Sequence, residues 1–432
     1  MKLKSSPAKL LAGTIKVPGD KSISHRSIML GSLAEGTSSI SNFLEGEDSI
    51  ATLKAFESMG IKINRPFAGE VEIEGVGLHG LKPPAKAIYL GNSGTAMRLL
   101  SGIMAGQKFT GTLTGDSSLS SRPMRRITEP LSLMGAKIKT ENDGTAPLII
   151  SKGNLTAIEY QMPVASAQVK SAILLAGLYA AGKTCVIEPA PSRDHTERML
   201  QGFGWNVEKK ESKVCIAGGG RLKACNIEVP NDISSAAFFM VAASIAANAD
   251  VTMTKVGINQ TRTGVIEILK MMGADIKIIN KSTSGGEPVA DIRVKSSRLH
   301  GIAIPENLVP LAIDEFPALF IAAACAEGTT ILSGAEELRV KESDRIAAME
   351  QGLLTLGVKA KATMDGMIID GPGKFQGGTV DSFDDHRIAM AFAIAACHAQ
   401  SDILIKNCEN INTSFPGFIE TANAAGMKIN QA

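Results

Sequence analysis

The chain has few aromatic residues, no closely spaced cysteines and no long apolar run. Aromatic residues make up 4% of its 432 residues. No stretch approaches the roughly 18 apolar residues of a membrane span, so we expect no membrane association. The six cysteines lack a CxxC pair or a zinc-like spacing, so we expect no metal and interpret them as buried or incidental thiols in a reducing cytosol, with thiol catalysis as a minor alternative. They are Cys185, Cys215, Cys225, Cys325, Cys397 and Cys408.

The charge balance excludes a further class of partner. Lys and Arg number 45 and Asp and Glu 43, a net charge of +2, so nothing indicates binding to nucleic acid. The N-terminal segment holds no apolar run long enough for a signal peptide. A length of 432 residues with 44% hydrophobic content predicts roughly two to three domains, in a protein that we expect in the cytoplasm.

Two series of residues recur in step along the chain. In the first, a helix-like stretch ends in glycine before an extended segment, because glycine enters positive φ without a Cβ penalty. In the second, a polar cluster is typical of a helix start. The glycines are Gly60, Gly135, Gly204, Gly273, Gly357 and Gly426, and the clusters are residues 19–26, 91–98, 166–172, 231–238, 313–319 and 384–390. Together they predict six copies of one α/β unit that reads strand, helix, strand, helix and short strands.

Two similar segments, KVPGDKS (16–22) and EVPNDIS (228–234), divide the six copies three and three if the N-terminal segment joins the second group. Both are typical of an extended crossing into a helix, since proline fixes φ and Gly or Asn tolerates positive φ. We therefore expect one discontinuous domain of residues 1–19 plus 230–432 and another of residues 20–229. Two ordinary strand–helix loops are the open alternative.

Two short motifs match nucleotide-binding patterns in the wrong context. Residues 177–184 satisfy GxxxxGK[ST], but a predicted helix enters and a β-rich segment leaves, the reverse of a P-loop. Residues 75–80 satisfy GxGxxG, but two prolines follow where a helix is required. We reject both as phosphate sites.

Lysine and arginine recur near the predicted helix starts, where the helix dipole would favour acids. Each one alone is best explained as solvated or paired with a neighbouring acid. Their recurrence at equivalent places favours a shared pocket for an anionic ligand, because helix N-termini bind anions and Arg grips carboxylate or phosphate through a planar fork. These cations are Lys21, Arg26, Arg98, Arg122, Lys341, Arg345 and Arg387.

Acidic residues accompany the cations. Asp314 lies at the start of an otherwise apolar element. Glu342 is flanked by Lys341 and Arg345, which favour its ionised form, and it relays a proton only if burial raises its proton affinity. We expect Asp232 to cap a helix.

Small polar residues complete the candidate pocket. Residues 92–95 offer amides and hydroxyls, and Gly94 permits close approach of a ligand. Residues 166–168 open a helix and suit a phosphate. Capping without a ligand is the alternative for both segments.

His386 is either a catalytic imidazole or, more commonly, a positioned structural one.

Nine segments occur in the order typical of one family. They are GDKSISHR, LGNSGTAMR, SRPMRR, SAQVK, RDHTE, NQTR, IDEFP, RVKESDR and DDHR. Over nearly the whole chain the sequence closely resembles the 5-enolpyruvylshikimate-3-phosphate synthases, and SAQ-x-K, R-x-H-x-E and N-x-T-R resemble the class II bacterial branch. Ser414 stands where many class I relatives have lysine, so a lysine contact to the second substrate is not carried over.

The resemblance implies a two-domain inside-out α/β barrel of βαβαββ-type units, with the active site in the cleft between the domains. It implies transfer of the enolpyruvyl group of phosphoenolpyruvate to the 5-hydroxyl of shikimate 3-phosphate, with release of phosphate, in the shikimate pathway to chorismate and the aromatic amino acids. It also implies no cofactor, a monomer, and glyphosate as an inhibitor at the phosphoenolpyruvate site. Gly94 favours glyphosate sensitivity because some tolerant class II enzymes have Ala there. Leu99 stands where many class I enzymes have proline, and this difference weakens the expectation of sensitivity.

The resemblance further implies a role for each matched residue. We expect Asp314 to be the base, and Glu342 and Lys21 to be the candidate proton donors. The implied shikimate 3-phosphate site comprises Lys21, Ser22, Arg26, Ser166, Ala167, Gln168, Arg193, Asp314 and Lys341. The implied phosphoenolpyruvate site comprises Lys21, Asn92, Gly94, Arg122, Gln168, Glu342, Arg345 and Arg387.

Two rival functions are considered. UDP-N-acetylglucosamine enolpyruvyl transferases share the fold and the donor, but they generally carry a reactive cysteine in the loop that corresponds to residues 110–122, which has none. A non-catalytic anion-binding protein built on the same repeats would need no base or proton donor beside its cations.

Overall fold

The computed structural model describes residues 1–371 and 374–432, which form two compact units. The terminal unit comprises Met1–Pro18, Pro230–Thr283 and Glu287–Ala432, and the central unit comprises Gly19–Val229 and Ser284–Gly286. Each unit has a hydrophobic core of its own. None of the helices in the described ranges combines the length and the apolar character needed to cross a membrane.

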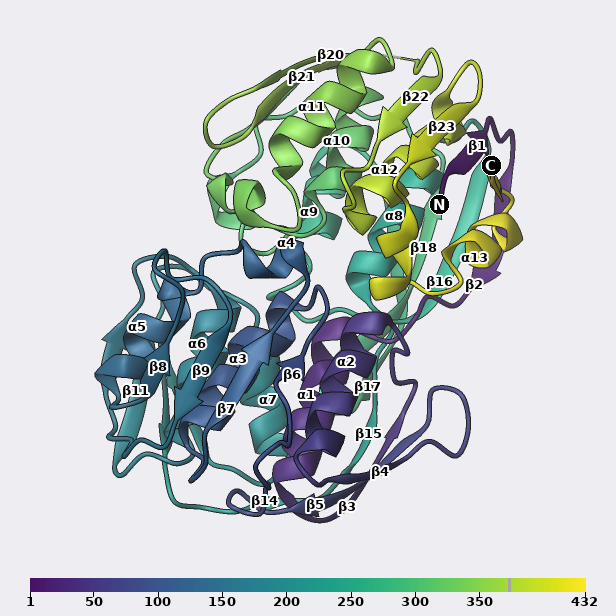
Figure 1. Cartoon of the computed structure of the whole chain (residues 1–432). Coiled ribbons are helices and arrows are strands. Elements are labelled where there is room, and N and C mark those ends of the chain that lie inside the picture. The colour runs from purple at the N-terminus through teal and green to yellow at the C-terminus, as the bar shows by residue number, and fades with distance from the viewer. Residues whose placement is uncertain (372–373) are drawn as a thin grey trace. The chain divides into compact units, whose positions relative to one another are not determined.

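The central unit contains three sheets (Figure 1). The strands of the first sheet are, in order, β14 (Leu222–Lys223), β3 (Ala34–Ser41), β5 (Val71–Val76) and β4 (Lys62–Asn64), and β15 (Asn226–Glu228) also pairs with β3. The second sheet has the order β6 (Ile88–Tyr89), β7 (Gly111–Thr114), β9 (Leu148–Ser151) and β8 (Lys137–Lys139). The third has the order β10 (Glu159–Gln161), β11 (Lys183–Ile187), β13 (Lys213–Ala217) and β12 (Val207–Lys210). The helices are α1 (Lys21–Leu33), α2 (Glu47–Ser58), α3 (Gly94–Ala105), α4 (Ser117–Ser120), α5 (Arg125–Leu133), α6 (Ala167–Gly177) and α7 (His195–Gly202). In each sheet the first pair of strands is parallel and the later pairs are antiparallel.

The terminal unit also contains three sheets; two of them begin with a parallel pair, and the middle one has three strands that are all antiparallel. In sheet order its strands are β2 (Leu11–Ile15), β16 (Ala249–Gly257), β18 (Glu287–Lys295) and β17 (Asp275–Ser284); β19 (Gly328–Leu332), β21 (Met367–Gly371) and β20 (Lys359–Ala362); and β22 (Gly378–Asp381), β23 (Ile403–Lys406), β1 (Leu3–Ser6) and β24 (Lys428–Gln431). The α-helices are α8 (Ile233–Ile245), α9 (Gly264–Met271), α10 (Phe316–Ala324), α11 (Arg345–Thr355), α12 (His386–Ala395) and α13 (Phe418–Ala424), and the 3₁₀ helices are η1 (Glu306–Leu308), η2 (Glu336–Val340), η3 (Ala396–His398) and η4 (Glu409–Thr413).

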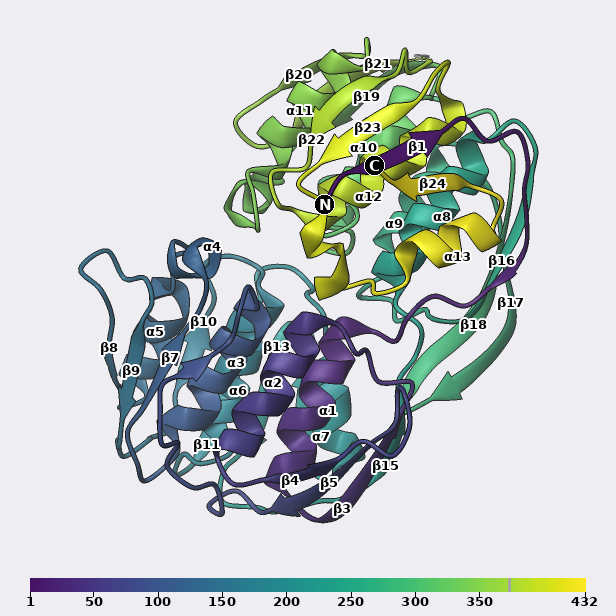
Figure 2. The same ribbon diagram turned by 45° about the vertical axis from the view of Figure 1, so that its right-hand side comes forward.

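Helices α8, α10 and α12 occupy the middle of the terminal unit, and the sheets lie around them (Figure 2). Helices α8, α10 and α12 contact one another, and every residue of all three is buried. Helices that are apolar on all sides have to be enclosed by other structure. The predicted α/β fold of repeated units, with helices inside and sheets outside, is therefore confirmed.

Both recurring series mark real helix boundaries. The six polar clusters begin α1, α3, α6, α8, α10 and α12, and the six glycines follow the last turns of α2, α5, α7, α9, α11 and α13. All six glycines adopt positive φ, between 81° and 99°. Gly177 ends α6 and Lys183 begins β11, which confirms that this P-loop match has the reverse order of elements.

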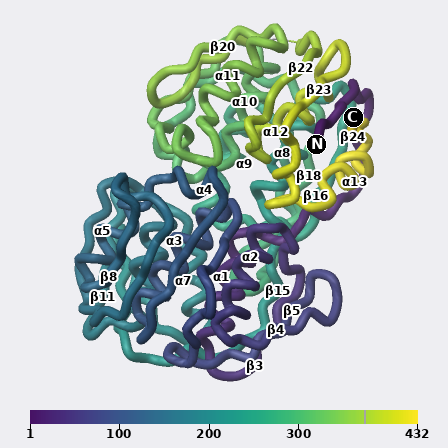
Figure 3. Tube along the Cα trace, viewed as in Figure 1, coloured from purple at the N-terminus to yellow at the C-terminus, as the bar shows by residue number. Residues whose placement is uncertain are grey.

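The N-terminal strands complete sheets of the terminal unit. β1 lies between β23 and β24, and β2 is paired with β16. The colour of the chain in Figure 3 shows this directly, because the purple start of the chain lies among teal and yellow segments. In the central unit, β14 and β15 complete the first sheet in the same way, from the far end of that unit's sequence.

The expectation of six unpaired thiols is wrong, because Cys185 and Cys215 form a disulfide. Cys185 on β11 is directly opposite Cys215 on β13, with Cα atoms 4.1 Å apart. The antiparallel register therefore brings together two cysteines that lie 30 residues apart in sequence. The other four are free, and burial raises the pKa of each thiol, which disfavours thiol catalysis.

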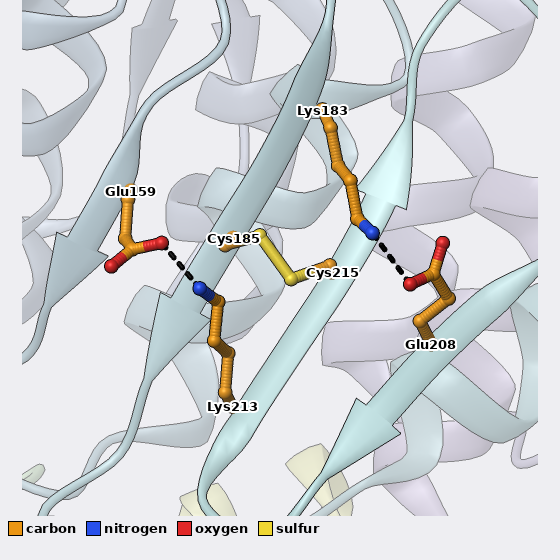
Figure 4. The surroundings of a disulfide bond; sticks show 6 residues. All are labelled: Glu159, Lys183, Cys185, Glu208, Lys213 and Cys215. Carbon is orange, nitrogen blue, oxygen red and sulfur yellow. Dashed lines mark hydrogen bonds and ion pairs between the residues drawn. A yellow bond between two sulfur atoms is a disulfide. The ribbon is translucent and has the colours of Figure 1, made fainter.

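Charged side chains surround the disulfide on the outer face of this sheet (Figure 4). Lys183 pairs with Glu208 at 2.5 Å, and Lys213 pairs with Glu159. The two cysteines themselves are only 6% and 5% exposed. Exposed ion pairs of this kind add little stability, so the covalent link is the main contribution of this face.

Removing one cysteine should destabilise the protein. For Cys215→Ser we expect the free energy of unfolding in urea, without reductant, to fall by roughly 2–4 kcal/mol, because a disulfide restricts the unfolded chain. Reductant should bring the wild type to the same stability as the variant. Thiol titration of the unreduced wild type in denaturant should find the four free thiols, and a count of all six cysteines would contradict the disulfide.

Candidate active site

In the terminal unit, the starts of three helices carry the predicted site residues. Asp314 lies just before α10, Arg345 is the first residue of α11, and Arg387 lies in the first turn of α12. Asp385 caps α12 by accepting a hydrogen bond from the Arg387 amide at 2.9 Å. Unpaired amides at a helix start favour acids such as Asp385, whereas the helix dipole disfavours Arg345 and Arg387 there.

Arg345 is the centre of the charge cluster in this unit. Its guanidinium lies 2.8 Å from Asp385, 2.6 Å from Glu342 and 3.5 Å from Asp314, and its side chain is 1% exposed. Burial alone would lower the pKa of Arg345, but these three carboxylates raise it above its ordinary value. The pKa of the Asp385 carboxyl, which burial would raise, is instead held below its usual range by Arg345. Both groups are therefore charged in the folded protein.

Asp314 connects this cluster to the other two cations. Lys341 Nζ lies 3.5 Å from its carboxylate, and Arg387 donates to its backbone carbonyl at 3.0 Å. The structure thus brings together all five residues predicted for this unit: Asp314, Lys341, Glu342, Arg345 and Arg387. The arrangement places one carboxylate, Asp314, beside cations that would also attract an anionic substrate.

A cluster of buried polar and charged side chains around Arg262 supports the segment that carries Asp314. Arg262, in the NQTR segment, donates to Ser234 at 2.7 Å and lies 3.3 Å from Asp232 and 3.6 Å from Glu315. Asp232 also caps α8, as predicted. Since Glu315 directly follows Asp314, this group fixes the backbone at the start of α10.

His386 has a structural environment. Its side chain is buried on α12, and its Nδ1 lies 3.4 Å from the hydroxyl of Thr413. This contact joins α12 to η4. Of the two interpretations drawn from the sequence, the contact favours the positioned structural imidazole.

In the central unit, Gly94 lies beneath two guanidinium groups. A Cβ at this position would be 3.2 Å from Nη1 of Arg122 and 3.5 Å from Nη1 of Arg98. Ser93 caps α3 by accepting from the Ala96 amide at 3.2 Å. Gly94 therefore keeps the space between a helix start and two cations free of a side chain, as an anion site requires.

Arg122 and Gln168 frame the same place. Arg122 donates to the side chain of Asn92 and, at 3.3 Å, to its carbonyl. Gln168 accepts from Arg98 at 2.5 Å and donates to Thr95 at 3.0 Å. The structure thus connects segments from α3, the loop after α4, and α6 around one cationic region.

Arg26 forms a second cationic point in the central unit. It donates to Thr196 at 2.7 Å, to Ser171 at 2.9 Å and to the carbonyl of Ser22 at 2.9 Å. These contacts join α1 to α6 and α7. The guanidinium therefore has a fixed direction before any ligand binds.

The other predicted residues of this unit lie on the same elements. Lys21, the first residue of α1, pairs with buried Asp48 on α2. Ser166 caps α6 by accepting from the Val169 amide at 3.4 Å, and Ala167 begins that helix. Arg193 is partly buried in the loop between β11 and α7.

The predicted residues thus form two sets, one within each unit. Sequence reasoning missed four side chains that hold them. Asp48 is one of two acids in the first turn of α2, and nothing local indicates its pairing with Lys21 or the meeting of Ser171 and Thr196 at Arg26. These residues are Asp48, Ser171, Thr196 and Asp385. Across residues 1–371 and 374–432, no group of three or more His, Cys, Asp or Glu side chains is arranged to hold a metal ion.

Comparisons with known proteins agree on one family. The family model described as EPSP synthase (3-phosphoshikimate 1-carboxyvinyltransferase) matches residues 6–422. The 3-phosphoshikimate 1-carboxyvinyltransferase of Methylococcus capsulatus is 63% identical, over 98% of this chain and 97% of that protein. That of Alkalilimnicola ehrlichii is 62% identical, over 98% and 95%.

Solved structures give the same result. An EPSP synthase from Acinetobacter baumannii is 57% identical to this chain, with a TM-score of 0.88 and full coverage of both chains. A second structure of EPSP synthase from that organism is 56% identical, with a TM-score of 0.89.

Protein stability should depend on pH through His25. This imidazole is buried on α1, and burial, followed by the charges of Lys21 and Arg26, holds its pKa well below its ordinary value. The unfolded chain therefore binds a proton near pH ~6.5 that the folded chain does not, so His25 lowers stability as pH falls below about 6.5 and has no such effect above it.

The measurement is the free energy of unfolding in urea from about pH 5 to about pH 8. In His25→Gln the fall on the acid side should be shallower than in the wild type. His300→Gln, at an exposed histidine, is the matched control. Equal pH slopes in all three proteins would contradict the assignment.

Proposed function

Because this chain belongs to the EPSP synthase (3-phosphoshikimate 1-carboxyvinyltransferase) family, we propose that its two residue sets serve one reaction. The enzyme transfers the enolpyruvyl group of phosphoenolpyruvate to the 5-hydroxyl of shikimate 3-phosphate and releases phosphate. The product belongs to the shikimate pathway to chorismate and the aromatic amino acids. Relatives at 63% and 62% identity over nearly the whole chain support this activity.

The observation that carries the residue assignment is the recurrence of cations at helix starts in both units. Both substrates are multiply anionic, and each carries a phosphate and a carboxylate. Helix N-termini and arginine forks are the groups that proteins use for such anions. Each unit supplies a set that is already oriented by contacts with neighbouring helices.

We assign shikimate 3-phosphate mainly to the second cationic point of the central unit. Ser22 and Arg26 would bind its carboxylate. Ser166, Ala167 and Gln168, at the start of α6, would bind its phosphate together with Arg193 and Lys21. Asp314 and Lys341 of the terminal unit would bind its hydroxyls.

We assign the phosphate of phosphoenolpyruvate to the region around Gly94. Lys21, Asn92, Gly94, Arg122 and Gln168 would surround it. Arg345 and Arg387 would hold the carboxylate, and Glu342 would lie at the reacting end. Arg345 already contacts the carboxylates of Asp314, Glu342 and Asp385. The substrate carboxylate would therefore compete with these three for the N–H groups of the guanidinium.

The proposed chemistry is an addition followed by an elimination. In the first step the 5-hydroxyl oxygen of shikimate 3-phosphate bonds to C2 of phosphoenolpyruvate while Asp314 takes the hydroxyl proton. Glu342 or Lys21 gives a proton to C3. In the second step C3 loses a proton as the C2–O bond to phosphate breaks, which restores the double bond. Lys341 and Arg345 each lie 3.5 Å from the Asp314 carboxylate and hold it in place.

We further propose that the repeats make two functional domains, residues 1–19 plus 230–432 and residues 20–229, and that the substrates bind in a cleft between them. Domain closure around the substrates would exclude water from the tetrahedral intermediate. We also propose that the enzyme is of the class II bacterial type, on the SAQ-x-K, R-x-H-x-E and N-x-T-R segments. We propose a monomer in the cytoplasm and glyphosate as an inhibitor, with Gly94 favouring sensitivity.

Phosphate release tests the function directly. The protein is incubated with phosphoenolpyruvate and either shikimate 3-phosphate or UDP-N-acetylglucosamine, and inorganic phosphate is measured. We expect release with shikimate 3-phosphate alone. Release with the nucleotide sugar would favour the rival transferase, and no release would favour an anion-binding protein.

In the same assay glyphosate should compete with phosphoenolpyruvate and raise its apparent KM. An apparent KM for phosphoenolpyruvate that stays unchanged with glyphosate would contradict the proposed binding of glyphosate at the phosphoenolpyruvate site.

Replacing the proposed base should separate turnover from binding. In Asp314→Asn we expect kcat to fall by about 10²–10⁴, the usual contribution of general base catalysis, while the Kd values of both substrates change little. Asp370→Asn, at an exposed aspartate of β21 that accepts from Thr329, is the control. Near-normal turnover in Asp314→Asn would rule out this residue as the base.

A further inference from the structure

A buried lysine with two buried glutamates lies close to the proposed acceptor residues of the central unit. Lys170 is fully buried on α6, and its Nζ lies 2.7 Å from Glu197 and 2.9 Å from Glu188. It also donates to the carbonyl of Ser192 at 3.4 Å. Burial alone would lower the pKa of Lys170, but the two carboxylates raise it, so the ammonium stays charged.

This cluster joins three separate segments. Lys170 lies on α6, Glu188 directly follows β11, and Glu197 lies on α7. The hydroxyl of Ser192 donates to the second oxygen of Glu188, so the loop before α7 is tied to the cluster at its backbone and its side chain. The same loop carries Arg193, which follows Ser192 directly.

A residue adjacent to the charged one on each helix forms a second link. Ser171, beside Lys170, lies 2.7 Å from Thr196, beside Glu197, hydroxyl to hydroxyl. Arg26 donates to both of these hydroxyls. Helices α6 and α7 are thus joined by the ion pair of Lys170 with Glu197 and by the adjacent hydrogen bond between the hydroxyls of Ser171 and Thr196. The guanidinium of Arg26 is hydrogen-bonded to both hydroxyls.

Stability alone does not explain the cluster. Apolar side chains of similar volume usually fill such a place with equal or greater stability, because two carboxylates and an ammonium lose their hydration on burial. What the charges add is direction, since three groups from three segments have to meet at hydrogen-bonding distance.

We propose that Lys170 is a positioning residue for shikimate 3-phosphate. It fixes α7 and the preceding loop against α6, and this sets both the hydroxyl pair that orients Arg26 and the loop that presents Arg193. The assignment rests on the proposed function, which gives Arg26 and Arg193 to the acceptor. Lys170 is itself fully buried and acts through these residues.

The test uses a neutral version of the cluster, Lys170→Met with Glu188→Gln and Glu197→Gln, in the full chain. The single change Lys170→Met leaves two carboxylates buried without their cation and is expected to destabilise the fold. In the triple variant we expect the melting temperature to stay near that of the wild type and KM for shikimate 3-phosphate to rise about tenfold, as for one weakened charge-assisted hydrogen bond. KM for phosphoenolpyruvate and kcat should change much less.

Two further variants make the outcome decisive. Lys183→Met, which removes an exposed ion pair of the same unit, should leave all parameters unchanged. Thr196→Val keeps the three charges but removes the hydroxyl that joins Arg26 to α7, so it should give the same selective rise in KM. The role proposed for Lys170 depends on this hydroxyl link, so an unchanged KM in Thr196→Val would overturn that role even if the triple variant does not fold.

The outcomes separate this assignment from the function on which it rests. A wild type that releases no phosphate from the two substrates would overturn the proposed function and the assignment with it. If the wild type is active, an unchanged KM for shikimate 3-phosphate, or an equal rise for both substrates, would overturn the positioning role alone.

Discussion

An α-helix that is apolar on every side is stable only when other structure encloses it, and this constraint organises the terminal unit. Helices α8, α10 and α12 cover one another, and the sheets lie outside them. Their sides are almost entirely apolar, and the charged side chains of these helices and of the residues just before them lie at their starts. The clustering of candidate site residues at helix starts follows from the packing of the helix sides.

Arg345 in the terminal unit and Lys170 in the central unit are buried cations that are each held by more than one carboxylate. Arg345 has three carboxylate partners and Lys170 has two, and both side chains are almost completely buried. A charge that has lost its hydration is tolerated only when it is paired and hydrogen-bonded. The same pairing fixes the direction of each group, so an anionic substrate would meet groups that need little rearrangement.

The sequence predicted what depends on local signals. Gly60 and its five counterparts end helices, and Asp232 caps one, because a single residue decides each of these conformations. The disulfide was missed because the register of β11 and β13 decides it. The partners of Lys170 and the pairing of Lys21 with Asp48 were missed for a related reason, since contacts between helices depend on packing that no short segment records. Positions of the cations were thus predictable, and the groups that orient them were not.

The place of β1 between β23 and β24 has a consequence for synthesis on the ribosome. Residues Leu3–Ser6 are made before both of their partner strands, which follow them by about 400 residues. The sequence from Gly19 to Val229 is complete long before that. Vectorial synthesis therefore lets the central unit begin folding while β1 still has no neighbour, and the sheet that contains β1 closes only after β23 and β24 have been made.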